Sequence, residues 1–263
     1  MDFARIAKAF APIAVLALGA GLAGCSGGKI SIDGEEGKKL SELDLTGAAP
    51  ENLVLAGPDK VQLTQGDKLA ITIDGDPAAS ENLRFTLKDG TLGILRSKNW
   101  KDAAPVTLHV TMPAPREMTL AGSGIIDAPG LGKDAKVTVA GSGEIRAGSV
   151  ATDSLKLTVA GSGAMTAAGA VKTLDLTIAG SGSANLAGLK ADSAKVTVAG
   201  SGSTAFTSDG EVAATIMGSG NVTVKGRARC KVSAMGSGTL TCESGPPVDE
   251  SDKDDARDAA EKK

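Results

Sequence analysis

A three-residue sequence, Gly-Ser-Gly, occurs seven times between residues 122 and 238. Its copies begin at Gly122, Gly141, Gly161, Gly180, Gly200, Gly218 and Gly236. The spacings between successive copies are 19, 20, 19, 20, 18 and 18 residues. A nearly constant period of this length is typical of repeat proteins, in which each small unit buries its apolar side chains by stacking on its neighbours. We therefore expect this part of the chain to be an array of similar units.

Apolar and polar residues alternate on both sides of each Gly-Ser-Gly. In the copy KVTVAGSG, Val137 and Val139 are apolar and Thr138 lies between them. Three positions before the first glycine, the copies have Thr119, Thr138, Thr158, Thr177, Thr197, Thr215 and Ser233. Alternation with a period of two predicts a strand with one buried face, and threonine suits the exposed face of a strand. Each repeat is therefore expected to be a strand, a corner, a second strand and a looser link.

Units that match column for column predict an all-β fold, a parallel β-solenoid or β-helix. We expect regular rungs of 18–20 residues with Gly-Ser-Gly corners over residues 118–245. Glycine has no Cβ and adopts positive φ readily, which suits a tightly stacked corner. The serines between the glycines are expected to form a hydroxyl ladder along this edge: Ser123, Ser142, Ser162, Ser181, Ser201, Ser219 and Ser237.

The main structural alternative is a series of hairpins closed into a barrel, because the strands of a membrane barrel also alternate. The aromatic girdles of such barrels need Trp and Tyr, and this chain has one Trp, no Tyr and four Phe. The segments between the corners are also short for a membrane-spanning strand of about 9–11 residues. The composition therefore favours the solenoid.

Residues 40–117 also have strand-like patterns, but their spacing is irregular. Strands are expected at residues 43–47, 60–65, 68–74, 82–96 and 105–113, with Asp89-Gly90 as a hairpin turn. This part is predicted to supply either irregular first rungs or a cap. A cap would protect the end of the solenoid from edge-to-edge association.

The first 24 residues have the features of a bacterial export signal. Arg5 and Lys8 precede an apolar run at residues 9–18, which is too short for a stable membrane span. Residues 22–25, Leu-Ala-Gly-Cys, resemble a lipobox, which predicts cleavage before Cys25 and lipidation of Cys25. Several acyl chains would anchor the protein firmly to a membrane. Ser26 then predicts an outer-membrane lipoprotein that faces the periplasm or the cell surface; the alternative is an ordinary secretory signal with an incidental cysteine.

Two further segments have the composition of non-globular chain. Residues 25–39 begin with Ser-Gly-Gly after the cysteine and are predicted to be a flexible tether. Residues 246–263 contain seven acidic and four basic residues and little apolar surface, which predicts a disordered, solubilising tail. A specific binding tail is the alternative.

Cys230 and Cys242 lie six residues before and six residues after the first glycine of the last copy. The corresponding positions of earlier copies are mostly apolar, so both cysteines are expected to face the core. An exported protein meets oxidising conditions, which predicts a disulfide that fixes the last rung. Two buried free thiols are the alternative.

The recurring VTVAGSG pattern, together with the upstream segments GPDKVQLTQGDKLAITID and VTLHVTMP, resembles the head GIN domain family of putative auto-transporter adhesins. The resemblance extends over residues 43–243, nearly the whole domain. It implies a bacterial envelope protein with a right-handed β-helical or β-roll body. It supplies no catalytic motif that can be transferred to this chain.

The outward positions of the repeats do not form the carboxylate cluster that a polysaccharide-cleaving site needs. Charged residues such as Glu144, Arg146, Lys156 and Asp175 are scattered along the array, as on a solvated face. The one histidine, His109, is expected on the exposed side of a strand. The corners lack the acidic residues of calcium-binding repeats. The sequence therefore predicts no catalytic site, metal or cofactor.

The formal net charge is −3 and no run of Lys or Arg is present, which argues against nucleic-acid binding. We expect a non-catalytic, lipid-anchored envelope protein whose surface serves adhesion or binds an envelope partner or a glycan. Two alternatives stay open. One is a carbohydrate-active β-helix enzyme with its site in residues 74–101, and the other is a self-associating envelope scaffold.

Overall fold

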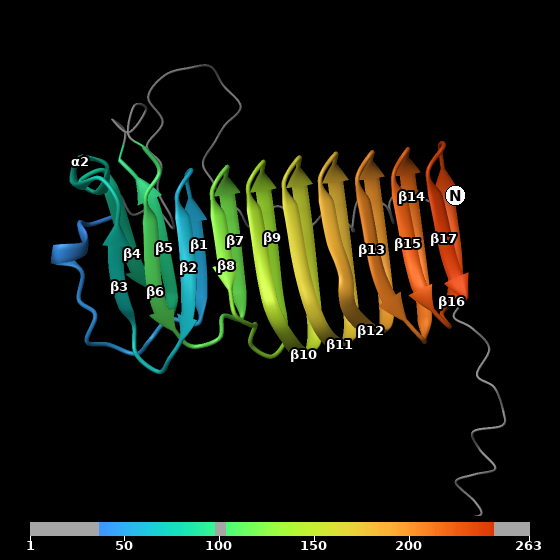
Figure 1. The fold of residues 1–263 in the computed structure, drawn as a ribbon, viewed down its shortest axis with the longest axis horizontal. Coiled ribbons are helices and arrows are strands. Elements are labelled where there is room, and N and C mark those ends of the chain that lie inside the picture. Colours follow the sequence, from blue (N-terminus) through green and yellow to red (C-terminus); the bar gives the residue numbers. More distant parts are fainter. Residues whose placement is uncertain (1–36, 98–103, 245–263) are drawn as a thin grey trace, which may run out of the picture.

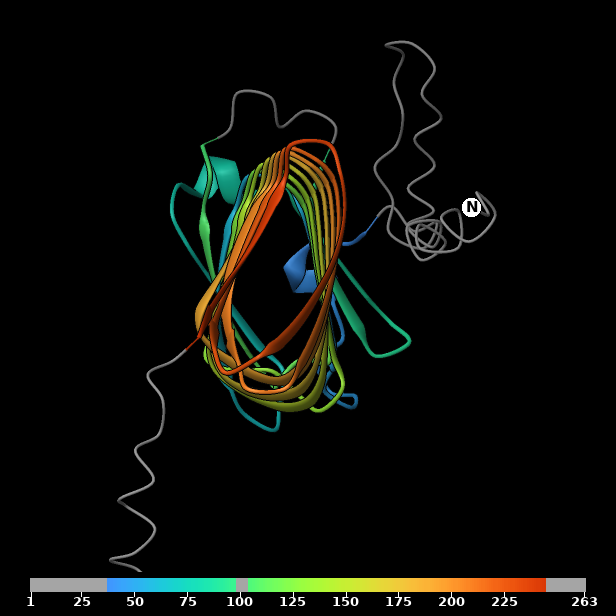
Figure 2. The same cartoon turned by 90° about the vertical axis from the view of Figure 1, so that its right-hand side faces the viewer.

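The computed structural model describes residues 37–97 and 104–244, which form one long β-solenoid (Figure 1). Its strands are connected in a single sheet that winds around the core. Viewed along the axis, the solenoid is a flattened ring of two walls that meet at a sharp corner (Figure 2). The predicted all-β solenoid is thereby confirmed. The alternative of hairpins closed into a barrel is wrong, because successive rungs pair in parallel.

Three long strands each make a complete rung: β10 (Glu144–Gly161), β11 (Ala164–Gly180) and β12 (Ser183–Gly200). Equivalent residues lie side by side, so that Thr158 pairs with Thr177 and Gly161 with Gly180. We call the part of each rung before the corner the first wall and the part after it the second wall. The in-register stacking predicted from the repeat is therefore confirmed.

Shorter strands continue both walls on either side of these three rungs. The first wall includes β7 (Glu117–Gly122), β9 (Ala135–Gly141), β14 (Glu211–Gly218) and β16 (Arg229–Met235). The second wall includes β8 (Ile125–Ala128), β13 (Ser203–Ser208), β15 (Asn221–Gly226) and β17 (Thr239–Ser244). Aliphatic side chains at alternate positions fill the space between the walls, as Val137, Val139 and Ile145 do.

The corners need their two glycines for different reasons. Gly180 has a φ of +120°, and a Cβ there would lie 2.5 Å from the carbonyl oxygen of Gly161 in the preceding rung. At Gly182 the obstacle is space, since a Cβ would lie 2.5 Å from Cγ1 of Val159 and 2.7 Å from the oxygen of Gly163. Both positions exclude a side chain because neighbouring corners stack backbone on backbone.

The N-terminal region contains two rungs and a cap. Its rungs consist of β1 (Asn52–Ala56) with β2 (Lys60–Gln65), and β5 (Thr91–Arg96) with β6 (Thr107–Met112). Rung order differs from chain order, because β1 lies between β5 and β7. The strands β3 (Ala70–Asp74) and β4 (Leu83–Lys88) pair antiparallel with β6 and β5 and, with the short helices α2 (Pro77–Ser80) and η2 (Leu40–Glu42), form the end of the solenoid.

Several local expectations for this region can be compared with the structure. The turn at Asp89-Gly90 is confirmed, and both residues have the positive φ of a tight hairpin. The strand expected at residues 43–47 is wrong. There, Asp44 accepts hydrogen bonds from the amide and the hydroxyl of Thr46, at 2.9 and 2.6 Å. Such a local side-chain turn competes with strand pairing.

The corner between β1 and β2 is a variant of the repeated corner. Gly57 occupies the place of the first glycine, and its carbonyl accepts the amide of Gly124 at 3.0 Å. Asp59 stands where the other corners have their second glycine, a position that faces the core. Its buried carboxylate is paired with the guanidinium of Arg96 on β5. The β1–β2 corner is therefore an eighth corner, in which an aspartate paired with Arg96 replaces the second glycine.

Among the described residues, the C-terminal rung, β16 and β17, is covered on one side only. β16 pairs with β14, and β17 pairs with β15. Val232 and Met235, the large hydrophobic side chains that are exposed in the described part of the chain, both lie on β16, at 55% and 69% exposure. In the described residues, no helix is both long enough and apolar enough to cross a membrane.

Candidate binding surface

The second wall changes character along its length. In the rungs near the N-terminal end, its outward side chains are charged and paired with one another. Lys60 lies 3.0 Å from Asp127, Arg146 lies 3.4 Å from Asp127, and Arg146 also pairs with Glu144 at 2.5 Å. The hydrogen bond to Glu144 raises the pKa of the Arg146 guanidinium above its ordinary value. These charges satisfy one another at the surface.

Further along the same wall, two outward columns have small, uncharged and mostly polar side chains. Strand pairing aligns Ser183, Ser203 and Asn221 in one column, and Asn185, Ala205 and Thr223 in the next. The two columns are the third and fifth residues after the first glycine of each corner. Their outward direction follows from the alternation that buries the residues between them.

A groove of about 260 Å³ lies over this part of β12, β13 and β15. Its lining consists of Ser183, Ala184, Asn185, Ser203, Thr204, Ala205, Asn221 and Thr223. Ala205 is the reason for the hollow, because its methyl group lies between the longer side chains of Asn185 and Thr223 in the adjacent rungs. We refer to this surface as the polar groove.

Most hydrogen-bonding groups of the polar groove point to solvent without a protein partner. Thr204 is the buried exception, and its hydroxyl donates to the carbonyl of Ala184 at 2.9 Å. The side-chain oxygen of Asn221 accepts the hydroxyl of Thr239 at 2.8 Å. Among the described residues, the side chains of Ser183, Ser203 and Asn185 are not engaged by the protein, so they remain available to a ligand.

The serines of the predicted hydroxyl ladder do lie in one exposed line along the corner edge. The contacts between them run through the backbone: the amide of Ser142 donates to the carbonyl of Gly122 at 3.0 Å, and that of Ser181 donates to Gly161 at 2.9 Å. Within the described chain, their hydroxyls make no hydrogen bonds with protein groups. A functional ladder of hydroxyls therefore stays a prediction.

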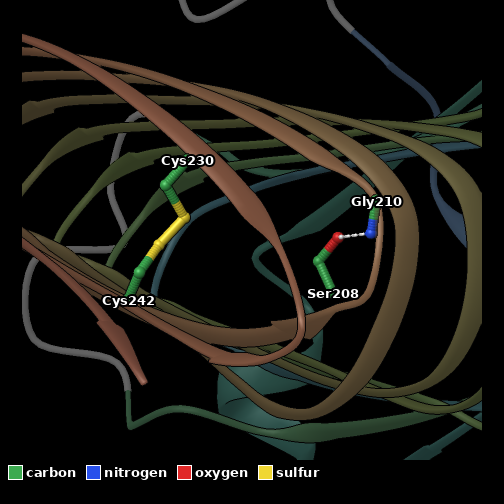
Figure 3. Close-up of a disulfide and its surroundings, with 4 residues drawn as sticks. All are labelled: Ser208, Gly210, Cys230 and Cys242. Atoms are coloured by element: carbon green, nitrogen blue, oxygen red, sulfur yellow. Dashed lines mark hydrogen bonds between the residues drawn. A yellow bond between two sulfur atoms is a disulfide. The ribbon is translucent and has the colours of Figure 1, made fainter. Parts of the chain in front are cut away.

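The cysteine pair is joined in a disulfide that spans the last rung between its two walls (Figure 3). Cys230 and Cys242 pair with Val212 and Val224 of the preceding rung, so both are in core columns as predicted. Cys230 is half-buried, and Cys242 is exposed because no further rung lies beyond it among the described residues. Nearby, the fully buried hydroxyl of Ser208 accepts the amide of Gly210 at 3.2 Å (Figure 3).

In the region considered for an enzymatic site, residues 74–101, two of the carboxylates have structural roles. Asp76 caps helix α2 by accepting the amide of Ala78 at 3.0 Å, and Glu81 pairs with Lys39 at 2.6 Å. Within the ranges that the structure describes, no group of three or more His, Cys, Asp or Glu side chains is arranged to hold a metal ion. His109 is exposed on β6, on the outward side as expected.

Several predicted features lie outside the described residues: the signal peptide at 1–24, the lipidated Cys25 and the charged tail at 246–263. The tether predicted for residues 25–39 does not extend to its full length. Lys38 exchanges two backbone hydrogen bonds of 2.8 Å with Phe85, so the chain is attached to β4 by that point.

The polar groove was not predicted from the sequence. The signal was present as a change in two columns, from Glu144 and Arg146 in an early rung to Ser203 and Ala205 in a later one. The hollow at Ala205 could not be predicted from the sequence, because it depends on which residues lie beside Ala205 in the adjacent rungs.

Three solved structures of bacterial proteins have a fold similar to that of this chain. A putative adhesin from Bacteroides fragilis has a similar structure, with a TM-score of 0.64 at 19% identity, over 75% of this chain and 93% of that one. A putative lipid binding protein from Parabacteroides distasonis gives a TM-score of 0.56 at 24% identity, over 74% and 93%. A putative adhesin from Parabacteroides distasonis gives 0.55 at 20% identity, over 75% and 93%.

A search among curated proteins finds no match. The family model described as "Putative auto-transporter adhesin, head GIN domain" matches residues 49–228, which extend from just before β1 to just before β16. The match includes the N-terminal rungs and the regular array up to β15, most of the range of the resemblance seen in the sequence. The chain therefore belongs to the head GIN domain family of putative auto-transporter adhesins.

Proposed function

We propose that the protein is a non-catalytic, lipid-anchored protein of the cell envelope that binds a neutral glycan in the polar groove. The observation that carries this proposal is the set of unengaged hydroxyl and amide groups on three successive rungs, with no charged residue in the lining. Serine, threonine and asparagine side chains both donate and accept hydrogen bonds, as sugar hydroxyls do.

The chemistry of the lining favours a glycan over other ligands. A phosphate or a nucleic acid would call for Lys or Arg, which the groove lacks. A lipid acyl chain would call for an apolar lining, so the description of one structural neighbour as a lipid binding protein is not the better guide here. A repeating ligand could also contact several stacked rungs at once, which strengthens binding without new kinds of contact.

An adhesion or binding role without catalysis is supported by family membership, since the family is one of putative adhesins. The carboxylates of Asp76 and Glu81 are engaged in a helix cap and an ion pair. Turnover of envelope polysaccharides by the purified protein, lost on changing a carboxylate in residues 74–101, would instead favour the carbohydrate-active enzyme.

Membership of an adhesin family indicates an envelope or surface protein. We attribute its attachment to acyl chains on Cys25, which follows a lipobox-like sequence. Cells grown with an alkyne-tagged fatty acid should label the wild-type protein and not the Cys25→Ser variant. Protease treatment of intact and lysed cells then separates a surface location, in which intact cells are cleaved, from a periplasmic one.

The binding proposal is tested by filling the groove. In the Ala205→Arg variant, a long cation replaces the methyl floor. Ala213→Arg is the matched control, because Ala213 is an exposed alanine on β14 in the first wall. Binding to a panel of neutral polysaccharides should be lost in the first variant and unchanged in the second. Equal binding by both variants, or no binding by the wild type to any neutral glycan, would remove the groove from the function.

A further inference from the structure

The two ends of the solenoid are built differently. At the N-terminal end, the antiparallel strands β3 and β4 and the short helices α2 and η2 terminate the rungs (Figure 1). At the C-terminal end, β16 and β17 each pair with one strand only, so the outer backbone groups of both strands have no strand partner among the described residues. An uncovered pair of strand edges is a ready site for pairing with another chain.

The side chains of this end are also suited to a partner. Val232, in a core column, is 55% exposed, and Met235, beside the corner, is 69% exposed. Leu240 on β17 is half-buried and packs at the margin of the core. Surface hydrophobic residues gathered at one end of a molecule mark an interaction site.

We propose that the β16–β17 end joins the same end of a second copy of this chain in a two-fold, tail-to-tail dimer. A head-to-tail stack would bring this parallel rung against the antiparallel strands of the other end, which offer a different pattern of hydrogen bonds. A two-fold axis instead brings two identical rungs together with their strands antiparallel. Such an interface is closed and self-complementary.

Charge complementarity selects the pairing between the strands. When β16 lies antiparallel to β17 of the partner subunit, with Val232 opposite Leu240 of the partner subunit, Arg229 lies opposite Glu243 of the partner subunit. Neither Arg229 nor Glu243 forms an ion pair within the described part of its own chain. The two-fold axis makes this contact twice. Pairing β16 with β16 would not bring Arg229 opposite Glu243, because β16 contains basic residues and no acidic one.

The oligomeric state of the complete chain, purified in a nonionic detergent and measured by sedimentation, tests the proposal. The wild type should be a dimer, and Val232→Lys should raise its dissociation constant at least about tenfold. Ala213→Lys, an exposed site one rung earlier, is the control and should leave dimerisation unchanged. Arg229→Glu and Glu243→Arg should each weaken the dimer, and the double variant should recover much of the loss.

Three results would overturn the proposal. The first is a wild type that sediments as a monomer at every concentration, and the second is a dimer that Val232→Lys does not weaken. A dimer that appears only after residues 245–263 are removed would mean that the chain's own C-terminal segment covers this end. Hydrogen exchange of β10–β12 in each variant shows that the solenoid itself is intact, so loss of the dimer cannot be confused with unfolding.

Discussion

The carboxylate of Asp59 and the guanidinium of Arg96 form a two-point ion pair inside the N-terminal rungs, where each side chain is 1% exposed. The carboxylate also accepts the amide of Val106 at 2.9 Å, and the guanidinium donates to the carbonyls of Ala79 and Ala104 at 3.0 Å. The pair therefore connects the β1–β2 corner to helix α2 and to β6. The contacts of the pair are buried, except that to the carbonyl of Ala104, which is part-buried.

Removing one partner of this pair should be costly, because the other charge is left buried. Asp59→Asn is expected to lower the free energy of unfolding by about 3–5 kcal/mol, measured by urea denaturation. Asp59→Gly with Arg96→Met should recover most of that loss, since the double variant restores the usual corner residue and removes the charge. Asp127→Asn, which breaks a surface pair, should cost no more than about 1 kcal/mol. A small effect of Asp59→Asn would show that the charge is not buried as described.

The two kinds of corner residue should respond differently to alanine. Gly180→Ala places a Cβ against the carbonyl of Gly161 in a backbone conformation that strains any side chain, and should cost about 1–3 kcal/mol or more. Ser181→Ala removes an exposed hydroxyl without a protein partner and should change stability by less than about 0.5 kcal/mol. Thermal unfolding of the two variants makes the comparison. A large loss from Ser181→Ala would indicate that the hydroxyl ladder has a structural role.

The disulfide should stabilise the last rung more than the rest of the solenoid. Cys230 and Cys242 are 12 residues apart, and closing a loop of this size stabilises by about 2–4 kcal/mol. Cys230→Ser with Cys242→Ser is therefore expected to speed hydrogen exchange in β16 and β17 and to leave β10–β12 little changed. Uniform acceleration along the whole chain would instead indicate that the rungs unfold as one cooperative unit.

Acid should weaken the last rungs through Glu211. Its hydrogen bond with Lys231 lowers the pKa of this carboxyl in the folded protein, below the ordinary value. A lowered folded-state pKa gives stabilisation that is present above the ordinary carboxyl range and is lost as the pH falls through the folded-state value. Glu211→Gln should flatten the acid side of the stability–pH curve, most clearly at low salt. A curve of unchanged slope would contradict this role.

The regular part of the fold could be predicted from the sequence because each rung repeats the same local decisions. Valine and threonine alternate in each rung, and glycine recurs at corners where only glycine fits. A residue such as Val139 or Gly180 therefore has equivalents in the other regular rungs, and one pattern predicts all of them. The corner at Gly57 was not predicted, because it has proline and aspartate where the repeated corners have serine and the second glycine. Asp59 is explained only by Arg96, which is 37 residues away in sequence.

The remaining differences from the sequence-based expectations have one local cause and two tertiary causes. Asp44 and Thr46 satisfy each other locally, and this outweighs the strand pattern of residues 43–47. Cys242 has the parity of a core residue, but within the described chain no rung lies beyond it to bury it. The polar groove depends on Ala205 being shorter than its neighbours in two other rungs, a comparison across about 20 residues in each direction that no local pattern contains.

Because the rungs stack in register, the number of rungs sets the length of the solenoid. Each rung presents to the next the same backbone edge that it receives, so a copy of residues 161–179 inserted after Ala179 would find both of its neighbours ready-made. Such a duplication would lengthen the body by about 4.8 Å while leaving the construction of its two ends unchanged. Gain or loss of one repeat in the gene would thus change the distance between the two ends by one rung. Neither end would need to change.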